Sequence, residues 1–213
     1  FLDTIASVGY EGDRASCTKL KYASMLAACF AYIAFRQGDR IGLFAYSDDV
    51  QQWIRPGSGQ AHFGRIVNGL SRLTAKGINK HESAWDQMVG NMPGRSMVVF
   101  LSDFLEAEDL LPERLRFALS SRYEALCLQV LDREEEELPS GDALRFVEME
   151  GNQEVSTSPG VIQSKYSNSM NQFKADLARN LARVSAEFES LFTDQDLGHA
   201  LRKFLGLRIR NVG

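Results

Sequence analysis

The sequence has few cysteines and no excess of basic residues. Its cysteines, Cys17, Cys29 and Cys127, show no paired short spacing, so neither a disulfide framework nor a zinc knuckle is indicated. We therefore expect a reducing, cytoplasmic compartment. The 24 Lys and Arg residues are outnumbered by 28 Asp and Glu, which gives a net charge of −4. Because nucleic-acid affinity needs clustered basic side chains, we expect no nucleic-acid partner.

Long hydrophobic runs are also lacking. The longest apolar run, from Met25 to Phe35, is about half of the roughly 20 residues that span a bilayer, and no signal-peptide pattern is present. This segment is therefore expected to make no membrane contact. The chain begins within what reads as a strand and without an initiator methionine, so we expect the full protein to extend upstream of Phe1.

Catalytic signatures are equally scarce. The sequence contains no G-x-x-x-x-G-K-[ST] phosphate loop, and its serines lack a nucleophile elbow. The histidines lie far apart in the sequence and are expected to be surface or capping residues; they are His62, His81 and His199. The acidic run 134–137 reads as a solvated turn. No enzyme activity is predicted from these features.

Apolar strands alternating with amphipathic helices dominate what is present. Strands are predicted at 1–3, 41–46, 50–54, 96–101, 125–131 and 188–192. The second of these turns at 47–49 into the third, which should form an antiparallel edge, with a loop at 55–59. Helices are predicted from Leu20 to a C-cap at Gly38 and at 62–73, 82–91, 110–121, 161–186 and 197–205.

This order of elements predicts an α/β fold with a doubly wound, mostly parallel sheet, one antiparallel edge strand and helices on both faces. We expect one domain over 1–213, with a small hairpin insertion, 144–149 paired with 153–155, in an appendage at 132–157. Sites in such sheets lie beyond the carboxyl ends of the strands. Asp3 and Asp103 both stand at such ends.

Several stretches, in this order, resemble the domain of unknown function 58 family of bacterial and archaeal proteins: DTIASVGYEG, KLKYASMLAACFAYIAFRQGDRIGLFAYSDDV, IRPGSGQAH, VVFLSDF, LQVLDREEEELP and FTDQDLGHALRKFL. The resemblance covers nearly the whole chain. It implies a von Willebrand factor A-like fold, in which a magnesium ion is held by a D-x-S-x-S motif, a threonine from a later loop and an aspartate after the central strand.

Carried over to this sequence, that ligand set is incomplete. Asp3, Ser7 and Asp103 match, but Ile5 replaces the middle serine, and the threonine loop 73–80 offers Ile78 or Asn79. Because magnesium requires oxygen ligands, the resemblance implies a degenerate metal-ion-dependent adhesion site with weak or absent metal binding. We hypothesise that Lys76 or, preferably, Lys80 places its ammonium group over the strand ends in place of the ion.

The resemblance implies a non-enzymatic protein-interaction module without a firmly bound cofactor. Its binding face would surround Asp3, Ser7, Asn79, Lys80 and Asp103. Because family members are commonly encoded beside MoxR-type AAA ATPases, such an ATPase is the implied partner, in a chaperone or assembly process. The alternative is a divalent-metal-dependent enzyme or binding domain that uses Asp3 and Asp103 with magnesium.

Overall fold

A computed structural model of the 213-residue chain describes residues 1–77, 96–105, 123–137, 144–147, 154–157, 159–198 and 200–202. The helices predicted at 82–91 and 110–121 lie outside these residues. Leu197, Gly198 and Ala200 to Arg202 are helical, within the last helix predicted from the sequence. No helix within the described ranges combines the length and the apolar character needed to cross a bilayer.

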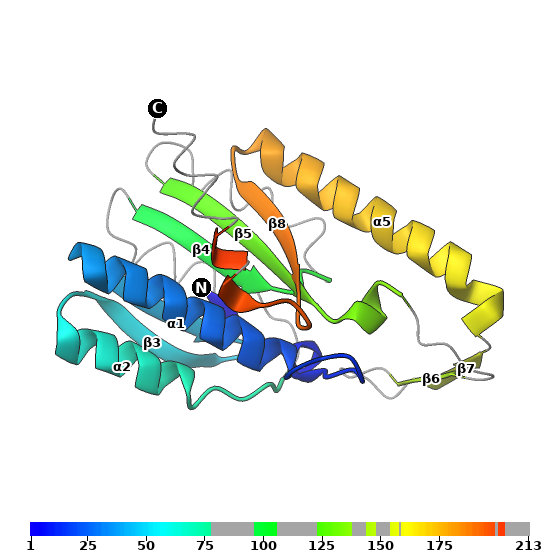
Figure 1. Cartoon of the computed structure of the whole chain (residues 1–213), viewed down its shortest axis with the longest axis horizontal. Helices are drawn as coiled ribbons and strands as arrows, with labels where there is room; N and C mark the ends of the chain where they lie inside the picture. The colour runs from blue at the N-terminus through cyan, green and yellow to red at the C-terminus, as the bar shows by residue number, and fades with distance from the viewer. Residues whose placement is uncertain are drawn as a thin grey trace.

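The main sheet has six strands in the order β3-β2-β1-β4-β5-β8 (Figure 1). They are β1 (Leu2–Asp3), β2 (Ile41–Tyr46), β3 (Val50–Gly57), β4 (Ser96–Ser102), β5 (Tyr123–Leu131) and β8 (Glu187–Phe192). Every neighbouring pair is parallel except β2 and β3, which are antiparallel. The predicted mostly parallel sheet with one antiparallel edge strand is therefore confirmed.

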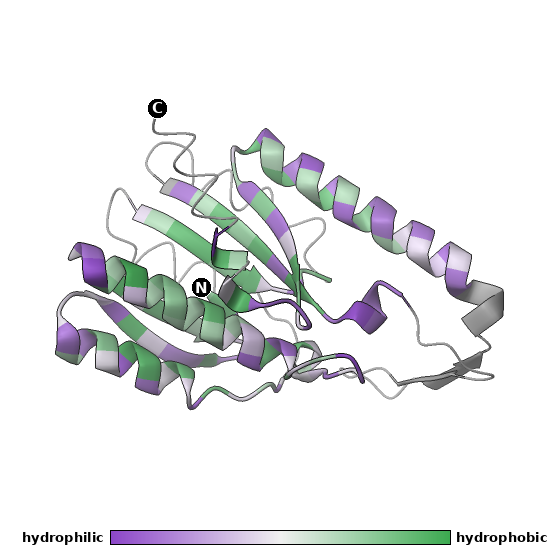
Figure 2. Cartoon of the chain, viewed as in Figure 1, coloured by the Kyte–Doolittle hydropathy of each residue, from purple (hydrophilic) through white to green (hydrophobic). Residues whose placement is uncertain are grey.

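Alternating residues of the strands face two separate cores. In β5, Leu126 and Leu128 belong to one cluster and Cys127 to the other, as the two-residue period of a strand requires. Helices α1 (Lys19–Gln37) and α2 (Gln60–Leu70) cover the first core, and α5 (Pro159–Arg183) covers the second (Figures 1 and 2). The predicted helices on both faces are confirmed.

Helix α5 packs much as its apolar pattern predicts. Leu177 and Leu181 have no exposed surface, and Phe173 and Val184 pack against the same cluster. Toward the start of the helix, Tyr166 is only half-buried, and its hydroxyl donates to the Glu135 carbonyl oxygen at 2.8 Å. The carboxyl-terminal half of the helix therefore packs on the core, and its amino-terminal half contacts the segment that follows β5.

Helix α1 begins and ends where capping chemistry places it. The Thr18 side chain accepts a hydrogen bond from the Lys21 amide, and Gly38 closes the helix in the left-handed conformation at φ 76°. The buried side includes Tyr22, Ala23 and Leu26. This arrangement places Lys19 in the first turn, on the side that faces the sheet.

The edge strand is longer than predicted, and α2 is shifted. β3 continues through Pro56 to Gly57, into the predicted loop 55–59, because a proline is tolerated on an edge strand that has no ladder partner for its missing N–H. Helix α2 begins at Gln60 and ends at Leu70, whereas the pattern predicted 62–73. These differences leave a helix lying alongside the edge strand.

The predicted hairpin insertion is confirmed. β6 (Leu144–Val147) and β7 (Glu154–Thr157) pair antiparallel in a two-stranded sheet of their own, with Phe146 opposite Val155. Figure 1 shows this hairpin beyond the end of β5, away from the main sheet.

Candidate functional site

The parallel pairing of β1 with β4 brings Asp3 and Asp103 to the same edge of the sheet. Leu2 pairs with Leu101, so the residues that follow each strand emerge together. Both aspartates are almost completely buried, with 2% and 1% of their surface exposed. The structure thus brings together the two carboxylates that the sequence predicted to meet.

Asp3 accepts hydrogen bonds at both carboxylate oxygens. The Ile5 amide donates to Oδ1 at 3.0 Å, and the Ser102 hydroxyl donates to Oδ2 at 2.7 Å. The Ser102 hydroxyl oxygen in turn accepts from the Phe104 amide at 3.0 Å. Ser102 therefore positions Asp3, a role that the sequence did not indicate.

Asp103 also has donors at both oxygens. Oδ2 accepts from the Ser7 hydroxyl at 2.8 Å and from the Lys19 ammonium at 2.9 Å, and Oδ1 accepts from the Leu105 amide at 3.3 Å. Its main-chain carbonyl accepts from the Gln129 side-chain amide at 2.9 Å. Ser7 and Asp103, predicted to share one site, are in direct contact.

Lys19 supplies the cation of this site. Its side chain has no exposed surface, and Nζ lies 2.9 Å from Asp103 and 2.5 Å from Glu135 Oε1. Burial alone would lower the pKa of Lys19, but the charges of Asp103 and Glu135 outweigh burial and raise the pKa above the usual lysine value. We call Asp3, Ser7, Lys19, Asp103 and Glu135 the strand-end cluster.

Tyr46 lies beside this cluster at the end of β2 and is itself buried. Burial raises its pKa well above the usual tyrosine value, and the charges of Asp3 and Asp103 raise it further. Both effects favour the neutral phenol.

The acidic segment after β5 is not the solvated turn predicted for 134–137. It forms a short helix, η2 (Arg133–Glu135), whose capping box links the Asp132 side chain to Glu134 N and the Glu135 carboxylate to Asp132 N. Because Glu135 Oε2 accepts this backbone bond at 2.8 Å, its Oε1 is held toward Lys19. The prediction of a solvated turn was wrong because these carboxylates accept hydrogen bonds from residues of other elements.

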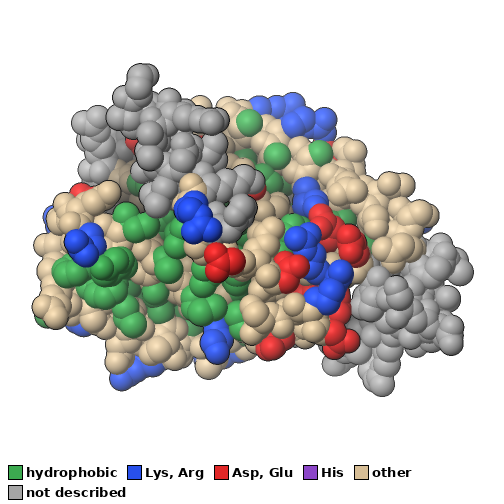
Figure 3. Space-filling view, viewed as in Figure 1, with side chains coloured by type: hydrophobic (Ala, Val, Ile, Leu, Met, Phe, Trp, Pro, Cys, Tyr) green, Lys and Arg blue, Asp and Glu red, His purple; other side chains and the backbone are tan. Residues whose placement is uncertain are grey.

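Those partners come mainly from the loop between β1 and α1. The Tyr10 hydroxyl donates to Glu134 at 2.7 Å, and the Gly12 amide donates to Asp132 at 3.1 Å. A Cβ on Gly12 would lie 2.6 Å from Asp132 Oδ1, so only glycine permits this approach. The mixed acidic and basic side chains of this region gather at one side of the surface in Figure 3.

Residues 73–77, the described part of the loop that the resemblance implied, lie against the strand ends. The Lys76 amide donates to the Thr4 carbonyl at 2.9 Å, and the Ala6 amide donates to the Gly77 carbonyl at 3.1 Å. Gly77 has φ 82°, and a Cβ there would meet Asp48 at 2.2 Å, so this turn also requires glycine. Ile78, Asn79 and Lys80 lie outside the described residues.

The hypothesis of a substituting lysine is therefore wrong for Lys76, which is exposed and forms no ion pair with Asp3 or Asp103. It stays a prediction for Lys80. The ammonium group that the structure places on Asp103 belongs to Lys19, in the first turn of α1.

Ile5 stands where the resemblance implied a serine ligand, and its side chain is part of the core. Its side chain is 1% exposed and belongs to the core cluster, while its amide binds Asp3. The Ser7 hydroxyl proton points to Asp103, and Lys19 already neutralises that carboxylate. These donors fit an internal ion pair better than a magnesium ion, whose ligands must all offer oxygen lone pairs.

One sequence signal could have identified Lys19. It lies at helical spacing from Tyr22, Ala23 and Leu26, all on the buried side of α1, so the periodicity places a lysine where an apolar residue is expected. A charged side chain in that position requires a buried partner of opposite charge. No such signal marks Glu135 among its acidic neighbours.

The chain is thus an α/β domain with a buried ion-pair cluster at the carboxyl ends of its parallel strands. Residues 1–176 match the family described as "Protein of unknown function DUF58", and the chain belongs to this family. It is 26% identical over 203 residues to the uncharacterized proteins Rv1480 of Mycobacterium tuberculosis and Mb1516 of Mycobacterium bovis. The alignment covers 93% of this chain but 63% of each relative.

Two solved structures share the fold. The conserved hypothetical protein BatB from Bacteroides thetaiotaomicron superposes with a TM-score of 0.64 over 99% of this chain and 95% of its own. An aerotolerance-related membrane protein from Bacteroides fragilis superposes with a TM-score of 0.63, over 99% and 96%. Both are 14% identical to this chain, a level at which the likeness concerns the fold.

Proposed function

We propose that this chain is a von Willebrand factor A-like protein-interaction module that binds its partner at the strand ends without a divalent cation. It is non-enzymatic in this proposal, and its degenerate adhesion site is an architectural element. The partner that we propose is a MoxR-type AAA ATPase in a chaperone or assembly process, as the family resemblance implies.

The observation that carries this proposal is the burial of Lys19 on Asp103. An ammonium group with no exposed surface, 2.9 Å from the carboxylate, supplies the positive charge that a metal ion would otherwise bring. A divalent cation at Asp103 would lie close to this buried ammonium group, and the repulsion between two cations that water does not screen opposes its binding.

The second support is that the protein's own donors saturate the aspartates. Each carboxylate oxygen of Asp3 and Asp103 accepts at least one hydrogen bond from the chain. Charge-assisted bonds of this kind fix the carboxylates in place. A partner would therefore meet a rigid face, with the partly exposed Leu105 and the exposed Lys76 at its margin.

A calorimetric titration tests the independence from metal. We expect magnesium and manganese to give no saturable binding heat with the wild-type chain up to roughly 10 mM, the weak end of protein affinities for such ions. Lys19→Met removes the competing ammonium group, and Lys165→Met, on the exposed side of α5, is the matched control. Saturable binding to the wild-type chain that Asp103→Asn abolishes would overturn the proposal.

A binding assay with the purified ATPase tests the partner. Binding should persist in EDTA, weaken in Leu105→Arg and Lys76→Glu, and remain unchanged in Lys165→Glu. Binding that requires magnesium, or that ignores both variants at the strand ends, would contradict the proposed mode. Turnover of a phosphate ester that disappears in Asp103→Asn would instead favour the metal-dependent enzyme.

A further inference from the structure

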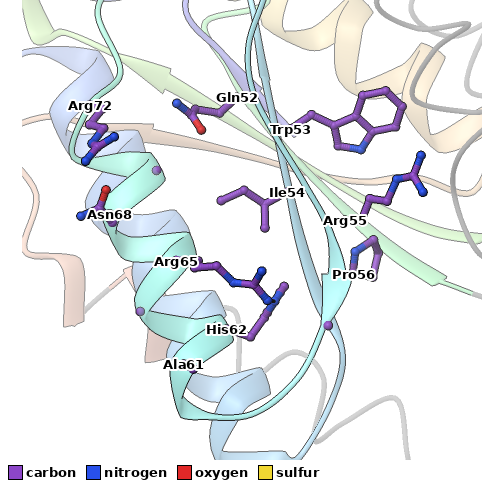
Figure 4. Close-up of a pocket in the computed structure, with 13 residues that line it drawn as sticks. Gln52, Trp53, Ile54, Arg55, Pro56, Ala61, His62, Arg65, Asn68 and Arg72 are labelled. Atoms are coloured by element: carbon purple, nitrogen blue, oxygen red, sulfur yellow. Dashed lines mark hydrogen bonds between the residues drawn. The ribbon is translucent and has the colours of Figure 1, made fainter.

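A groove lies between the edge strand β3 and helix α2 (Figure 4). Its volume is about 740 Å³. It runs alongside β3 from Gln52, near the strand ends, to Gly57, which pairs with Ile41 at the opposite end of the sheet. The groove is therefore open and follows the strand over six residues, from Gln52 to Gly57.

Small residues of α2 and an apolar side chain of β3 form its floor. Ile54 points from the strand toward the helix in Figure 4 and also packs against the core. Gly64, in the middle of α2, faces open space, since no atom lies within 4 Å of a Cβ built there. A larger side chain at Gly64 would occupy this open space.

The charge of the groove has one sign. Arg65 and Arg72 extend from the α2 side. Arg55 points from β3 away from the helix, beside Trp53, and all three arginines are exposed (Figure 4). The residues that line the groove include no aspartate or glutamate. In a chain with net charge −4, the described residues that line this groove therefore form a local concentration of positive charge.

Arg65 is held in place by a buried histidine. His62, predicted to be a surface or capping residue, is 4% exposed, and its Nε2 lies 2.7 Å from the Ile41 carbonyl oxygen. Because that oxygen can only accept, Nε2 carries the proton and Nδ1 accepts from the Arg65 guanidinium at 2.9 Å. The arginine is therefore oriented before any ligand arrives.

The exposed edge of β3 offers backbone hydrogen bonds along the same groove. Within the described part of the sheet, β3 pairs only with β2, and from Gln52 to Ile54 the register is regular. Alternate residues of such an edge direct their N–H and C=O groups outward. An added strand would find both these groups at Gln52 to Ile54, with the arginines beside them. Farther along, Pro56 has no N–H, and its carbonyl oxygen accepts from Arg40 at 3.0 Å.

The charges decide which kind of strand fits. A second copy of this chain would bring its own Arg55, Arg65 and Arg72 to the shared edge, and like charges at an edge oppose pairing. An acidic strand would instead place carboxylates against guanidinium groups, which suit them in geometry and charge. The occupant is therefore a chain of opposite charge.

We propose that this groove binds an acidic, extended segment of a partner protein, which adds as a strand along β3. Alternate side chains of the segment would point toward α2, where Arg65 and Arg72 lie, and toward the opposite face, where Arg55 lies beside Trp53. This second surface goes beyond the strand-end face, so its failure would leave the proposed function intact.

Fluorescence anisotropy with short peptides tests the proposal. The probe is a labelled peptide of alternating glutamate and valine, roughly ten residues long, the length of a long strand. We expect it to bind, to weaken as salt is added, and to bind at least roughly tenfold more tightly than the matched lysine–valine peptide. Two further peptides carry N-methyl groups, one at its odd-numbered residues and the other at its even-numbered residues. At least one of them should bind more weakly than the unmethylated peptide.

Two variants address the groove from different sides. Arg72→Glu reverses one exposed charge and should weaken binding roughly tenfold, the effect of one charge-assisted hydrogen bond. Gly64→Leu adds a Cβ that meets no atom within 4 Å and extends a side chain over the open floor; it should also weaken binding, while its Tm stays at or above that of the wild-type chain. Lys165→Glu, on α5, makes the same charge reversal elsewhere and should bind like the wild-type chain.

Several results would overturn the proposal. These are no binding of the acidic peptide at about 1 mM, equal binding of the lysine peptide, or binding that neither groove variant alters. Unchanged binding of both N-methylated peptides would reduce the contact to charge alone and exclude an added strand. Tighter binding of an oligouridylate that Arg72→Glu abolishes would assign the groove to a nucleic-acid backbone instead.

Discussion

The strand-end cluster and the groove beside β3 treat positive charge in opposite ways. In the cluster, Lys19 has no exposed surface and two carboxylates within 2.9 Å. At the groove, Arg65 and Arg72 on the α2 side and Arg55 on the opposite face of β3 are exposed, and no carboxylate is among the residues that line it. The positive charge of the cluster is neutralised by carboxylates of the same chain, whereas the positive charges at the groove are exposed to solvent.

The difference teaches which charges hold the fold and which can act on a ligand. A charge removed from water must be matched by the chain itself, because an unpaired buried ion destabilises the folded state by several kcal/mol. An exposed charge needs no internal partner, and its loss has little effect on stability. A basic residue can therefore stabilise the fold at one end of the sheet, and basic residues along the sheet edge are free to contact a ligand.

The largest expected effect follows from removing the buried cation. Lys19→Met leaves Asp103 and Glu135 buried without their counter-ion and should lower the free energy of unfolding by about 3–5 kcal/mol. Urea unfolding measures it, with Lys165→Met, an exposed lysine on α5, expected to stay within about 0.5 kcal/mol of the wild-type chain. Equal stabilities of the two variants would erase the distinction between the two regions.

A smaller loss is expected where the cluster joins the far edge of the sheet. Gln129, which has no exposed surface, donates to the Asp103 carbonyl at 2.9 Å and accepts from the Ser190 hydroxyl at 2.8 Å. Gln129→Leu leaves both groups without this partner and should lower the free energy of unfolding by about 1–3 kcal/mol. In the same urea assay, Gln172→Leu on the outside of α5 should change it by no more than about 0.5 kcal/mol.

The pH dependence of stability should also reveal the contribution of the buried Lys19 ion pair. Because its pKa is raised from 10.5 in the folded state, its contribution is complete at neutral pH and is lost as pH rises from 10.5 through the folded pKa. The wild-type chain should then lose stability by up to about 1.4 kcal/mol per pH unit relative to Lys19→Met. Parallel stability profiles for the two proteins above pH 10.5 would be incompatible with a raised pKa.

The smallest effects belong to the groove and differ in sign between two glycines. Gly64→Ala meets no atom within 4 Å and should raise the free energy of unfolding by about 0.5–1 kcal/mol, as expected for a helix interior. Gly57→Ala would place a Cβ 2.7 Å from His62 Nδ1 and should lower the free energy of unfolding. Thermal denaturation distinguishes them, and a loss of stability in Gly64→Ala would show that the groove floor is already filled.

The sheet could be predicted from the sequence because its signal is local. The apolar run at 96–101 and the turn at 47–49 place β4, β2 and the antiparallel edge, and the rule that sites follow strand ends brings Asp3 and Asp103 together. The length of β3 was missed because Pro56 normally ends a strand, whereas an edge position tolerates it.

The sequence predicted that Asp3, Ser7 and Asp103 share a site, but it did not predict the ion pair that completes the cluster. The helical spacing of Lys19 could have indicated a buried lysine, whereas Glu135 is one of four consecutive glutamates that nothing in the sequence distinguishes. Only the three-dimensional register of the end of β5 against α1 selects Glu135 over its neighbours. Local patterns do not contain that register.

The sequence separation of the cluster also has a kinetic consequence. Lys19 is separated by 84 residues from Asp103 and by 116 from Glu135, so its ammonium group can be desolvated favourably only after β4 and β5 have joined the sheet. We therefore expect this ion pair to form after the folding transition state, and the loss of such a late contact changes mainly the unfolding rate. The ion pair should therefore stabilise the native state more than the transition state. Its loss should accelerate unfolding much more than it slows folding.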